Sequence, residues 1–546
     1  MSLNKTRRGL RWIALFASGT GLLVACGSRT GLDYGPPKPP PPECYVAADC
    51  PDFGDFCKPV ICAPLDDMPD AGPSEVAKTG GQCKKAVPVD CDDHDPCTAD
   101  TCDPGTGLCS YALATLDLDN DGYRGPLPGT IAGQPGSCGD DCDDTNAKAH
   151  PGGIEVCDGV DNDCNGIIDD NAGYIPLDDA PVRISGDIAP AGPGGLAYSG
   201  NVYASVYTGT SSGFDVYVSM LDPTGKTITP PGETQFTIVN ADASGGPVTW
   251  IGDRFGLAWQ DRRTGDYEIF VSILGEDGAK KFPDTQITSA PGFSVNPALA
   301  WNKNEFLVVW QDDRDGLFNL YAQRVSPDSK PIGENLALTD AGSTGLGNES
   351  PSIAVGAKGV GISWFVGDAL NKLVQFQVFS PDLTTTITPP ILLTDGSTKT
   401  RSPTVVWNKD RYVISWFDIT APSKAIYATA VDESGVIVVP TKAISNPGPF
   451  RSRYPYLRPL GDRLLAVYSD DRDQNDGYEL YSRMISADLE PLSPEQRLTN
   501  AKKDSIYPIP AFGPEGNVGI LFRDDRLQEQ DVWFTRLGCV TSPNPP

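Results

Sequence analysis

The feature that most constrains this chain is a repeat that runs from about residue 181 to residue 540. In each unit an apolar segment ends in an aromatic residue, and successive aromatics lie 51 to 54 residues apart. These aromatics are Tyr207, Trp259, Trp310, Trp364, Trp416, Tyr468 and Phe522. A proline precedes each at a similar interval, and these prolines are Pro193, Pro247, Pro297, Pro351, Pro403, Pro455 and Pro508. Such even spacing indicates stacked copies of one structural unit.

Each unit contains the material for four short antiparallel strands. The aromatic is followed by a polar loop, an apolar strand such as EIFVSIL, a turn such as DESG, and a short strand such as KAIS. Seven such units predict an all-β fold, a seven-bladed β-propeller over residues 181–540. A solenoid and a tandem set of β-sandwiches are the alternatives. The chain ends favour a closed ring, because the seventh unit lacks its outer strand and segment 181–185 matches the outer strand 495–499 of the sixth unit.

Four units carry an acidic and basic cluster directly after the aromatic. The arginines of these clusters are Arg263, Arg314, Arg472 and Arg526. One interpretation is that each Asp–Arg pair holds its loop or the neighbouring blade in place. The other is a ring of charges at one mouth of the propeller that binds a saccharide or a peptide.

The first 26 residues have the pattern of an export signal. Four basic residues precede an apolar run that ends at Ala25. The tetrad LVAC at 23–26 resembles the lipobox of bacterial lipoproteins, which implies a signal peptide over 1–26 and a lipid on Cys26. An ordinary secretory signal with a chance cysteine is the alternative. Gly27 resembles the residue that follows the cysteine in lipoproteins destined for the outer membrane, so we expect the outer membrane or the cell surface.

A proline-rich segment and a cysteine-rich segment follow. Residues 27–43 include GPPKPPPPE and predict a stiff, extended linker. Thirteen of the 15 cysteines lie between Cys44 and Cys164, and residues 44–112 read as two tandem copies. Without Cys26 an even number of cysteines remains, which predicts seven disulfides rather than metal thiolates in an exported protein. Parity further suggests that Cys539 bonds a cysteine of the N-terminal region, such as Cys44.

Residues 113–173 are rich in acids placed at alternate positions. Asp117, Asp119, Asp121 and the Tyr123 carbonyl match the first half of an EF-hand calcium loop, although Pro128 stands where the last ligand is usual. Two further clusters could supply the remaining oxygens. The first contains Asp140, Asp141, Asp143 and Asp144. The second repeats the loop pattern with Asp161, Asp163, Asn165, the Ile167 carbonyl and Asp169.

The order DLDNDGY, DCDD and HPGGIEVCDGVDNDCNGIIDD resembles the metal-binding motif of MopE-type bacterial surface proteins over residues 117–170. Asn165 stands where Asp is usual in that motif. The residues themselves favour Ca²⁺ in a structural role, because Ca²⁺ takes six to eight oxygens in irregular geometry, whereas soft metals prefer thiolate or imidazole. A solvated acidic linker is the alternative. We therefore expect a disulfide-rich calcium-loop neck (residues 44–173) with little regular structure ahead of the propeller.

Charge and composition limit the function. A net charge of -29 opposes nucleic acid as a partner, and only His94 and His150 are available for histidine chemistry. We expect a cell-surface lipoprotein that is not an enzyme, held to the membrane by its lipid, whose propeller binds an unknown protein or glycan. A propeller hydrolase acting on glycans is the alternative, because paired carboxylates alone can serve such an enzyme.

Overall fold

The computed structural model describes residues 42–51, 54–64, 80–156, 160–166, 172–188, 191–210, 213–228, 234–237, 242–368, 371–397, 399–419, 424–473 and 477–541. The predictions for Cys26, for the linker up to residue 41, and for Ile167 and Asp169 lie outside these residues. The chain divides into two compact units, residues 1–113 and 114–546. Within the described residues, no helix has the length and apolar character needed to cross a membrane.

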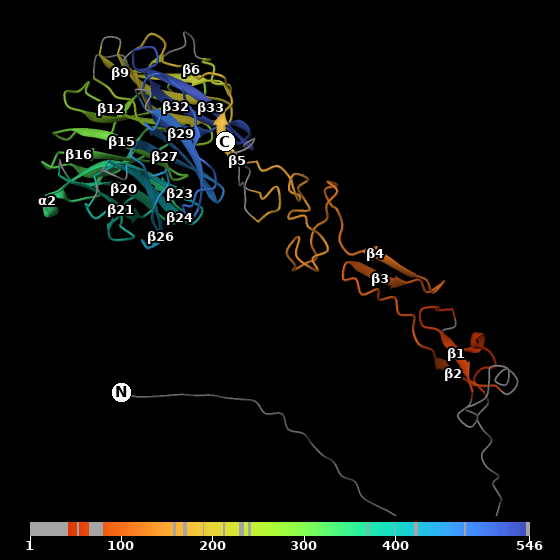
Figure 1. Cartoon of the computed structure of the whole chain (residues 1–546). Coiled ribbons are helices and arrows are strands. Elements are labelled where there is room, and N and C mark those ends of the chain that lie inside the picture. Colours follow the sequence, from red (N-terminus) through yellow and green to blue (C-terminus); the bar gives the residue numbers. More distant parts are fainter. Residues whose placement is uncertain are drawn as a thin grey trace, which may run out of the picture. The chain divides into compact units, whose positions relative to one another are not determined.

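The second unit contains the predicted seven-bladed, all-β propeller (Figure 1). Blade one contains β7 (Ala191–Tyr198), β8 (Tyr203–Thr210), β9 (Phe214–Leu221) and β10 (Thr234–Gln235). Blade two contains β11 (Val248–Trp250), β12 (Phe255–Asp261), β13 (Glu268–Leu274) and β14 (Thr285–Gln286). Blade three contains β15 (Ser294–Trp301), β16 (Phe306–Asp312), β17 (Asn319–Val325) and β18 (Pro331–Ala337). Blade four contains β19 (Gly347–Val355), β20 (Val360–Gly367), β21 (Lys372–Phe379) and β22 (Ile391–Leu392).

Blades five to seven continue the same antiparallel order. Blade five contains β23 (Thr400–Asn408), β24 (Arg411–Asp418), β25 (Ile426–Asp432) and β26 (Ile437–Ala443). Blade six contains β27 (Ser452–Leu460), β28 (Arg463–Asp470), β29 (Glu479–Ser486) and β30 (Gln496–Arg497). Blade seven contains β31 (Ser505–Phe512), β32 (Val518–Asp524) and β33 (Asp531–Thr541), together with β5 (Ala172–Pro176) and β6 (Val182–Arg183). Two short helices, α2 (Ala341–Thr344) and η2 (Pro514–Gly516), lie between strands.

The repeated aromatics lie on the second strand of each blade and are buried. Trp259 of blade two packs in one apolar cluster with Val216 and Val218 of blade one. The faces of successive blades therefore form the core between them, and each large ring removes a correspondingly large apolar area from water. This packing explains why the aromatic recurs at nearly constant spacing.

The repeated prolines mark β-bulges in the first strands. In blades three to seven the ladder shifts register at the proline, and the residue before it has a positive φ between 51° and 57°. These residues are Asn296, Ser350, Ser402, Tyr454 and Tyr507. A bulge leaves backbone groups out of the ladder, so a proline fits there without the loss of a ladder hydrogen bond.

The predicted closure by an N-terminal strand is confirmed. Val182 and Arg183 of β6 pair antiparallel with Phe534 and Trp533 of β33. Arg183 also donates to the fully buried carboxylate of Asp531 at 2.7 Å. A second strand, β5, pairs with the end of β33 from Leu537 onward and was not predicted from the sequence. Two N-terminal strands therefore complete the last blade.

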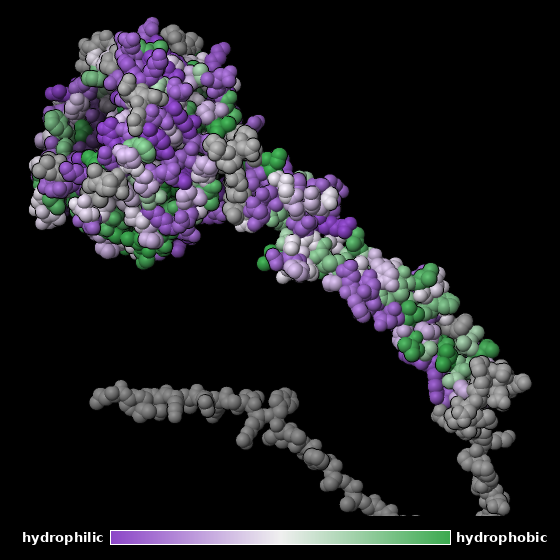
Figure 2. Space-filling model, viewed as in Figure 1, coloured by the Kyte–Doolittle hydropathy of each residue, from purple (hydrophilic) through white to green (hydrophobic). Residues whose placement is uncertain are grey.

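The first unit contains two short hairpins and the 3-10 helix η1 (Ala47–Asp49). β1 (Val60–Ala63) pairs with β2 (Gln82–Lys85), and β3 (Thr98–Cys102) pairs with β4 (Cys109–Leu113). Among the described residues before 114, the buried apolar side chains are cysteines alone, whereas large side chains such as Phe56 and Leu108 are exposed. Figure 2 shows hydrophobic residues, in green, on the surface of this unit. Cross-links therefore replace an apolar core in this unit.

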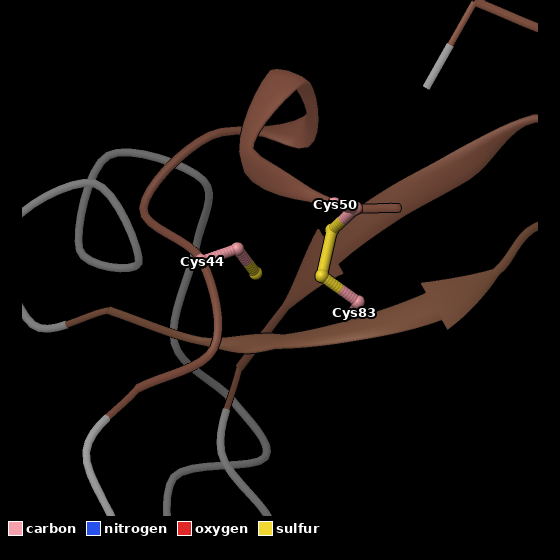
Figure 3. A group of neighbouring side chains, drawn as sticks. All are labelled: Cys44, Cys50 and Cys83. Atoms are coloured by element: carbon pink, nitrogen blue, oxygen red, sulfur yellow. A yellow bond between two sulfur atoms is a disulfide. The ribbon is translucent and has the colours of Figure 1, made fainter. Parts of the chain in front are cut away.

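Disulfides hold the two cysteine-rich copies together. The described pairs in the first unit are Cys44–Cys62, Cys50–Cys83, Cys57–Cys102 and Cys91–Cys109. Figure 3 shows the Cys50–Cys83 bond with the Cys44 sulfur beside it. Because these sulfurs are oxidised, they are not thiolate ligands, and the prediction of disulfides over metal thiolates is confirmed for them.

The suggested pairing of Cys539 with Cys44 is wrong, because Cys44 bonds Cys62 across the first hairpin. Cys539 is itself disulfide-bonded, as are Cys97 and Cys138. The cysteines of the described disulfides are already paired, so the partner of Cys539 is another cysteine that precedes the propeller in the sequence. The expectation of a link from Cys539 to the N-terminal region therefore stands with a different partner.

Candidate functional site

The first acidic loop, residues 117–123, folds around its own carboxylates. Asp117 accepts a hydrogen bond from the Gly122 N–H at 3.1 Å, and Asp119 accepts one from the N–H of Asp121 at 3.2 Å. Positive φ angles at Asn120 (65°) and Gly122 (100°) turn the chain sharply between them. Carboxylate oxygens of the three aspartates consequently lie within 4.8 Å of one another.

Each carboxylate of this loop keeps one buried oxygen that has no hydrogen-bond donor. These atoms are Asp117 Oδ1, Asp119 Oδ2 and Asp121 Oδ2. The fully buried Asp141 adds a fourth, because its Oδ1 accepts the Asp143 N–H while its Oδ2 has no donor. Burial raises the pKa of Asp141, and the charges of Asp121 and Asp119 raise it further. Buried acceptors without donors are uncommon, so converging carboxylates of this kind indicate a cation site.

The second acidic loop repeats the backbone of the first. Asp161 accepts a hydrogen bond from the Gly166 N–H, five residues later, at 2.7 Å. Asp163 accepts one from the Asn165 N–H at 3.1 Å. The φ angles of Cys164 (58°) and Gly166 (92°) match those at the same positions of the first loop. The repeated sequence pattern thus produces a repeated local structure.

Glu155 completes the second group and was missed by the sequence analysis. Its Oε1 accepts the Asp163 N–H at 2.8 Å, its Oε2 is buried without a donor, and burial raises its pKa. Ligand oxygens of Glu155, Asp161 and Asp163 lie within 4.8 Å of one another. Glu155 precedes the loop and falls outside its alternating pattern, so only the folding back of the chain reveals it. In the sequence, the one sign that Glu155 could join this group is that it lies six residues before Asp161.

A disulfide between Cys142 and Cys164 joins the segment that carries Asp141 to the second loop. The Cys142 N–H donates to the Cys164 sulfur at 3.1 Å. The two sulfurs lie near Asp141, but as members of a disulfide they do not act as thiolate ligands. The atoms of both groups that are available to a metal ion are therefore carboxylate oxygens.

The remaining predicted ligands have different positions. Asp140 is exposed and belongs to neither group. Asp143 accepts from the Thr145 hydroxyl at 2.7 Å, and Asp144 accepts from the Leu118 N–H at 3.0 Å. Asp144 therefore fastens the middle cluster to the first loop.

Tyr123 and Asn165 occupy the loop positions that the pattern assigns to them. The Tyr123 N–H donates to Asp121 at 2.8 Å, and its ring stacks on His150 with centroids 4.8 Å apart. The Asn165 side chain donates to Asp163 at 2.9 Å. Both loops are thus held by contacts from residues of the same segment.

Part of this segment matches a known family. Residues 141–170 match the family Cu-binding_MopE. Its description is "Putative metal-binding motif". The match contains Asp141, Glu155 and the second loop of the MopE-type motif, whereas the first loop precedes it. A comparison with curated proteins gives no match.

The matches among solved structures have low sequence identity and low TM-scores. Raptor of Chaetomium thermophilum has a TM-score of 0.42 and 11% identity, with 67% of this chain and 30% of that chain covered. The phage phi92 endosialidase has a TM-score of 0.39 and 8% identity, with 69% of this chain and 70% of that chain covered. A subtype N11 neuraminidase-like protein of a flat-faced bat influenza virus has a TM-score of 0.38 and 12% identity, with coverage of 68% and 95%.

The four arginines predicted at a propeller mouth are held within their own blades. Each forms an ion pair with the aspartate two residues before it. Each also lies over an aromatic ring of the third strand, at 4.6 Å for Arg263, 4.2 Å for Arg314, 4.4 Å for Arg472 and 4.6 Å for Arg526. None of the four is among the residues that line the central channel. These contacts support a positional role, and ligand binding by these arginines stays a prediction.

The aspartates of these clusters are strongly held. Burial alone would raise the pKa of Asp312, but hydrogen bonds from Arg314 and Trp310 hold it below its ordinary value. Arg314 also lies 3.4 Å from the Asn335 side chain on the outer strand of the same blade. The pair therefore connects the second, third and fourth strands.

The first strands of all seven blades line a central channel of about 640 Å³. At one end of this channel lie the positive-φ residues that precede the prolines. Gln260 accepts the Asn296 N–H at 2.8 Å, and Gln311 accepts the Ser350 N–H at 2.8 Å. These glutamine contacts join one blade to the next around the channel. A cavity of this volume is large enough for a small molecule.

Proposed function

We propose that this chain is a bacterial surface lipoprotein whose propeller is a non-catalytic binding module and whose neck is stiffened by Ca²⁺. The observation that carries the proposal is the pair of acidic loops with buried carboxylate oxygens that lack donors. Together with the disulfides, these loops give rigidity to a segment that has almost no apolar core. Such a segment suits a protein that works in an oxidising compartment.

The oxygen ligands that these loops offer suit Ca²⁺ better than they suit copper, the metal in the name of the matched family. Both groups offer carboxylate oxygens, and the loop pattern assigns the Tyr123 carbonyl as a further oxygen ligand. Hard oxygen donors in irregular geometry suit Ca²⁺, whereas copper favours imidazole, thiolate or thioether. The ring of His150, the histidine nearest in sequence to these loops, stacks on the Tyr123 side chain. The second group would hold its ion through Glu155, Asp161 and Asp163.

Calorimetric titration of the full-length chain in detergent tests the calcium part. We expect two sites in the micromolar to millimolar range, and Asp161→Asn should weaken one of them by about 10-fold, as expected for the loss of one charged ligand. Asp140→Asn is the matched control, because Asp140 is exposed and outside both groups. Absence of calcium binding at millimolar concentration would contradict this part of the proposal.

The anchor is tested in a bacterial host with a labelled fatty acid. The wild-type chain should carry the label and be cleaved by protease added to intact cells. Cys26→Ser should lose the label and be released from the membrane fraction. Retention of the label by Cys26→Ser would show that the lipid lies elsewhere, and a protected propeller would place the protein away from the surface.

A further inference from the structure

We propose that the central channel of the propeller binds an oxyanion carried by a small polar molecule, with Arg458 as the residue that recognises it. The proposal deepens the function above, since it rests on the propeller being a binding module. The channel has the opposite charge character to the rest of the chain. Among the described residues that line it, Arg458 is the one charged side chain and there is no acid, although the chain as a whole carries a net charge of -29.

The repeat shows that Arg458 is an exception among equivalent positions. It follows the repeated proline of blade six by three residues on β27. In the strand ladder Arg458 pairs with the residue three before the repeated aromatic, and the residues in the same register of the other blades are Ala197, Thr249, Ala300, Ala354, Val406 and Ala511. Along β27, Tyr456, Leu457 and Arg458 all line the channel, and Leu457 also belongs to the core between blades five and six. Arg458 lies on the opposite face of β27 from Leu457 and reaches the next blade, and its side chain also lines the channel.

Arg458 has no acidic partner. Its Nε donates to the Pro510 carbonyl of the next blade at 2.6 Å, and no carboxylate forms an ion pair with it in the part of the chain that the structure describes. Arg314 and Arg472, by contrast, each bind a buried aspartate of their own blade. The Arg458 side chain is half-buried, so its charge is partly removed from water without a counter-ion, and an anion bound in the channel would stabilise it.

The surrounding groups define the ligand chemistry. A guanidinium presents parallel N–H donors that match a carboxylate or a phosphate. Tyr456 also lines the channel beside Arg458, and the rings of Tyr454 and Tyr507 lie 4.2 Å apart at one end. Tyrosine rings and polar side chains such as Asn296 suit a sugar ring or a similar polar organic group. The competing role for Arg458 is purely structural, as a fastener of blade six to blade seven through Pro510.

Isothermal titration of the full-length chain in detergent separates these roles. The probes are D-glucuronate, glucose 6-phosphate and inorganic phosphate, with glucose as the uncharged control. We expect at least one anion to bind and glucose to bind at least about 10-fold more weakly. Arg458→Gln should weaken anion binding by about 10- to 100-fold, as expected for loss of charge-assisted hydrogen bonds. Arg254→Gln, a change at an arginine outside the channel, should leave binding unchanged.

The pattern of binding identifies the source of the oxyanion. Binding of glucuronate alone indicates a carboxylate, and binding of both phosphates indicates a phosphoryl group. Undetectable binding of all three anions, or equal binding by wild type and Arg458→Gln, overturns the proposal. If Arg458→Gln does not fold, Tyr456→Phe and Arg458→Lys replace it, and unchanged affinity in both variants overturns the proposal equally. Anion binding by a chain that fails the fatty-acid test would reject the anchor and leave the channel site intact.

Discussion

Replacement of Asp119 by asparagine should have opposite effects on the first acidic loop with and without calcium. Three carboxylates lie there within 4.8 Å of one another. At that distance, two unit charges repel by about 3.5 kcal/mol at an effective dielectric of about 20. The side chains are half-buried, so water and salt reduce the repulsion. Without a cation, we therefore expect Asp119→Asn to stabilise the loop by about 2 kcal/mol.

With calcium bound, the same change removes a charged ligand and should weaken binding by about 10-fold or more. The amide oxygen of asparagine can still accept the Asp121 N–H that Asp119 accepts at 3.2 Å, so the turn itself is preserved. Hydrogen exchange of peptides from residues 114–125 of the full-length chain measures both effects. In EDTA the variant should exchange about 30-fold more slowly than wild type, which corresponds to about 2 kcal/mol. In millimolar calcium it should exchange faster.

Asp140→Asn is the matched control, since it removes one negative charge from an exposed site outside the loop. It should change exchange little in either condition. The reasoning is refuted if Asp119→Asn loosens the loop equally in EDTA and in calcium. It is also refuted if wild type exchanges at the same rate in both.

Three further predictions concern the scaffold. Arg183→Met should destabilise the propeller by about 2–4 kcal/mol, because it leaves the buried Asp531 without its cation. Denaturation of this variant, of Asp531→Asn and of the double variant should show strong energetic coupling between the two residues, and additive losses of stability would contradict the pairing. Arg314→Met should lower the free energy of unfolding by about 2–4 kcal/mol through the loss of its contacts with Asp312, and it should leave anion affinity in the channel unchanged. A variant with lower anion affinity and wild-type stability would favour the binding interpretation of this arginine. Cys142→Ala should lower the stability of the acidic segment by about 3 kcal/mol in the same exchange assay and weaken calcium binding, and wild-type protection would show that the disulfide is dispensable.

The repeat made the propeller predictable, because its information is local and redundant. Seven buried aromatics and seven prolines each report the same position of a blade, and the segment 181–185 matches the strand that the last blade lacks. The strand β5 had no such signal, since AGYIP does not resemble the other outer strands. Its pairing with β33 depends on where the chain lies after the fold has formed.

The acidic loops were predictable for the same local reason. Their alternating carboxylates and glycines determine a turn within seven residues, and the structure reproduces the turn twice. Glu155 and Arg458 show the limit of this reasoning. Glu155 joins its group only after the chain folds back. Arg458 stands out only because the other blades place no acidic side chain among the described residues that line the channel. Contacts between segments that are distant in the sequence leave no periodic pattern of residues in it.

The two N-terminal strands of blade seven also set an order of events during folding. β6 at residues 182–183 and β5 at residues 172–176 find their partner only in residues 531–541. Every other blade is complete within a short stretch of chain, but the last one joins segments about 350 residues apart. Without residues 531–541, β5 and β6 therefore have no partner strand within the blade, and unpaired strands can pair with other chains. Truncation at either end should leave strands of blade seven unpaired. We therefore expect the ring to resist aggregation only when β5, β6 and β33 are all present.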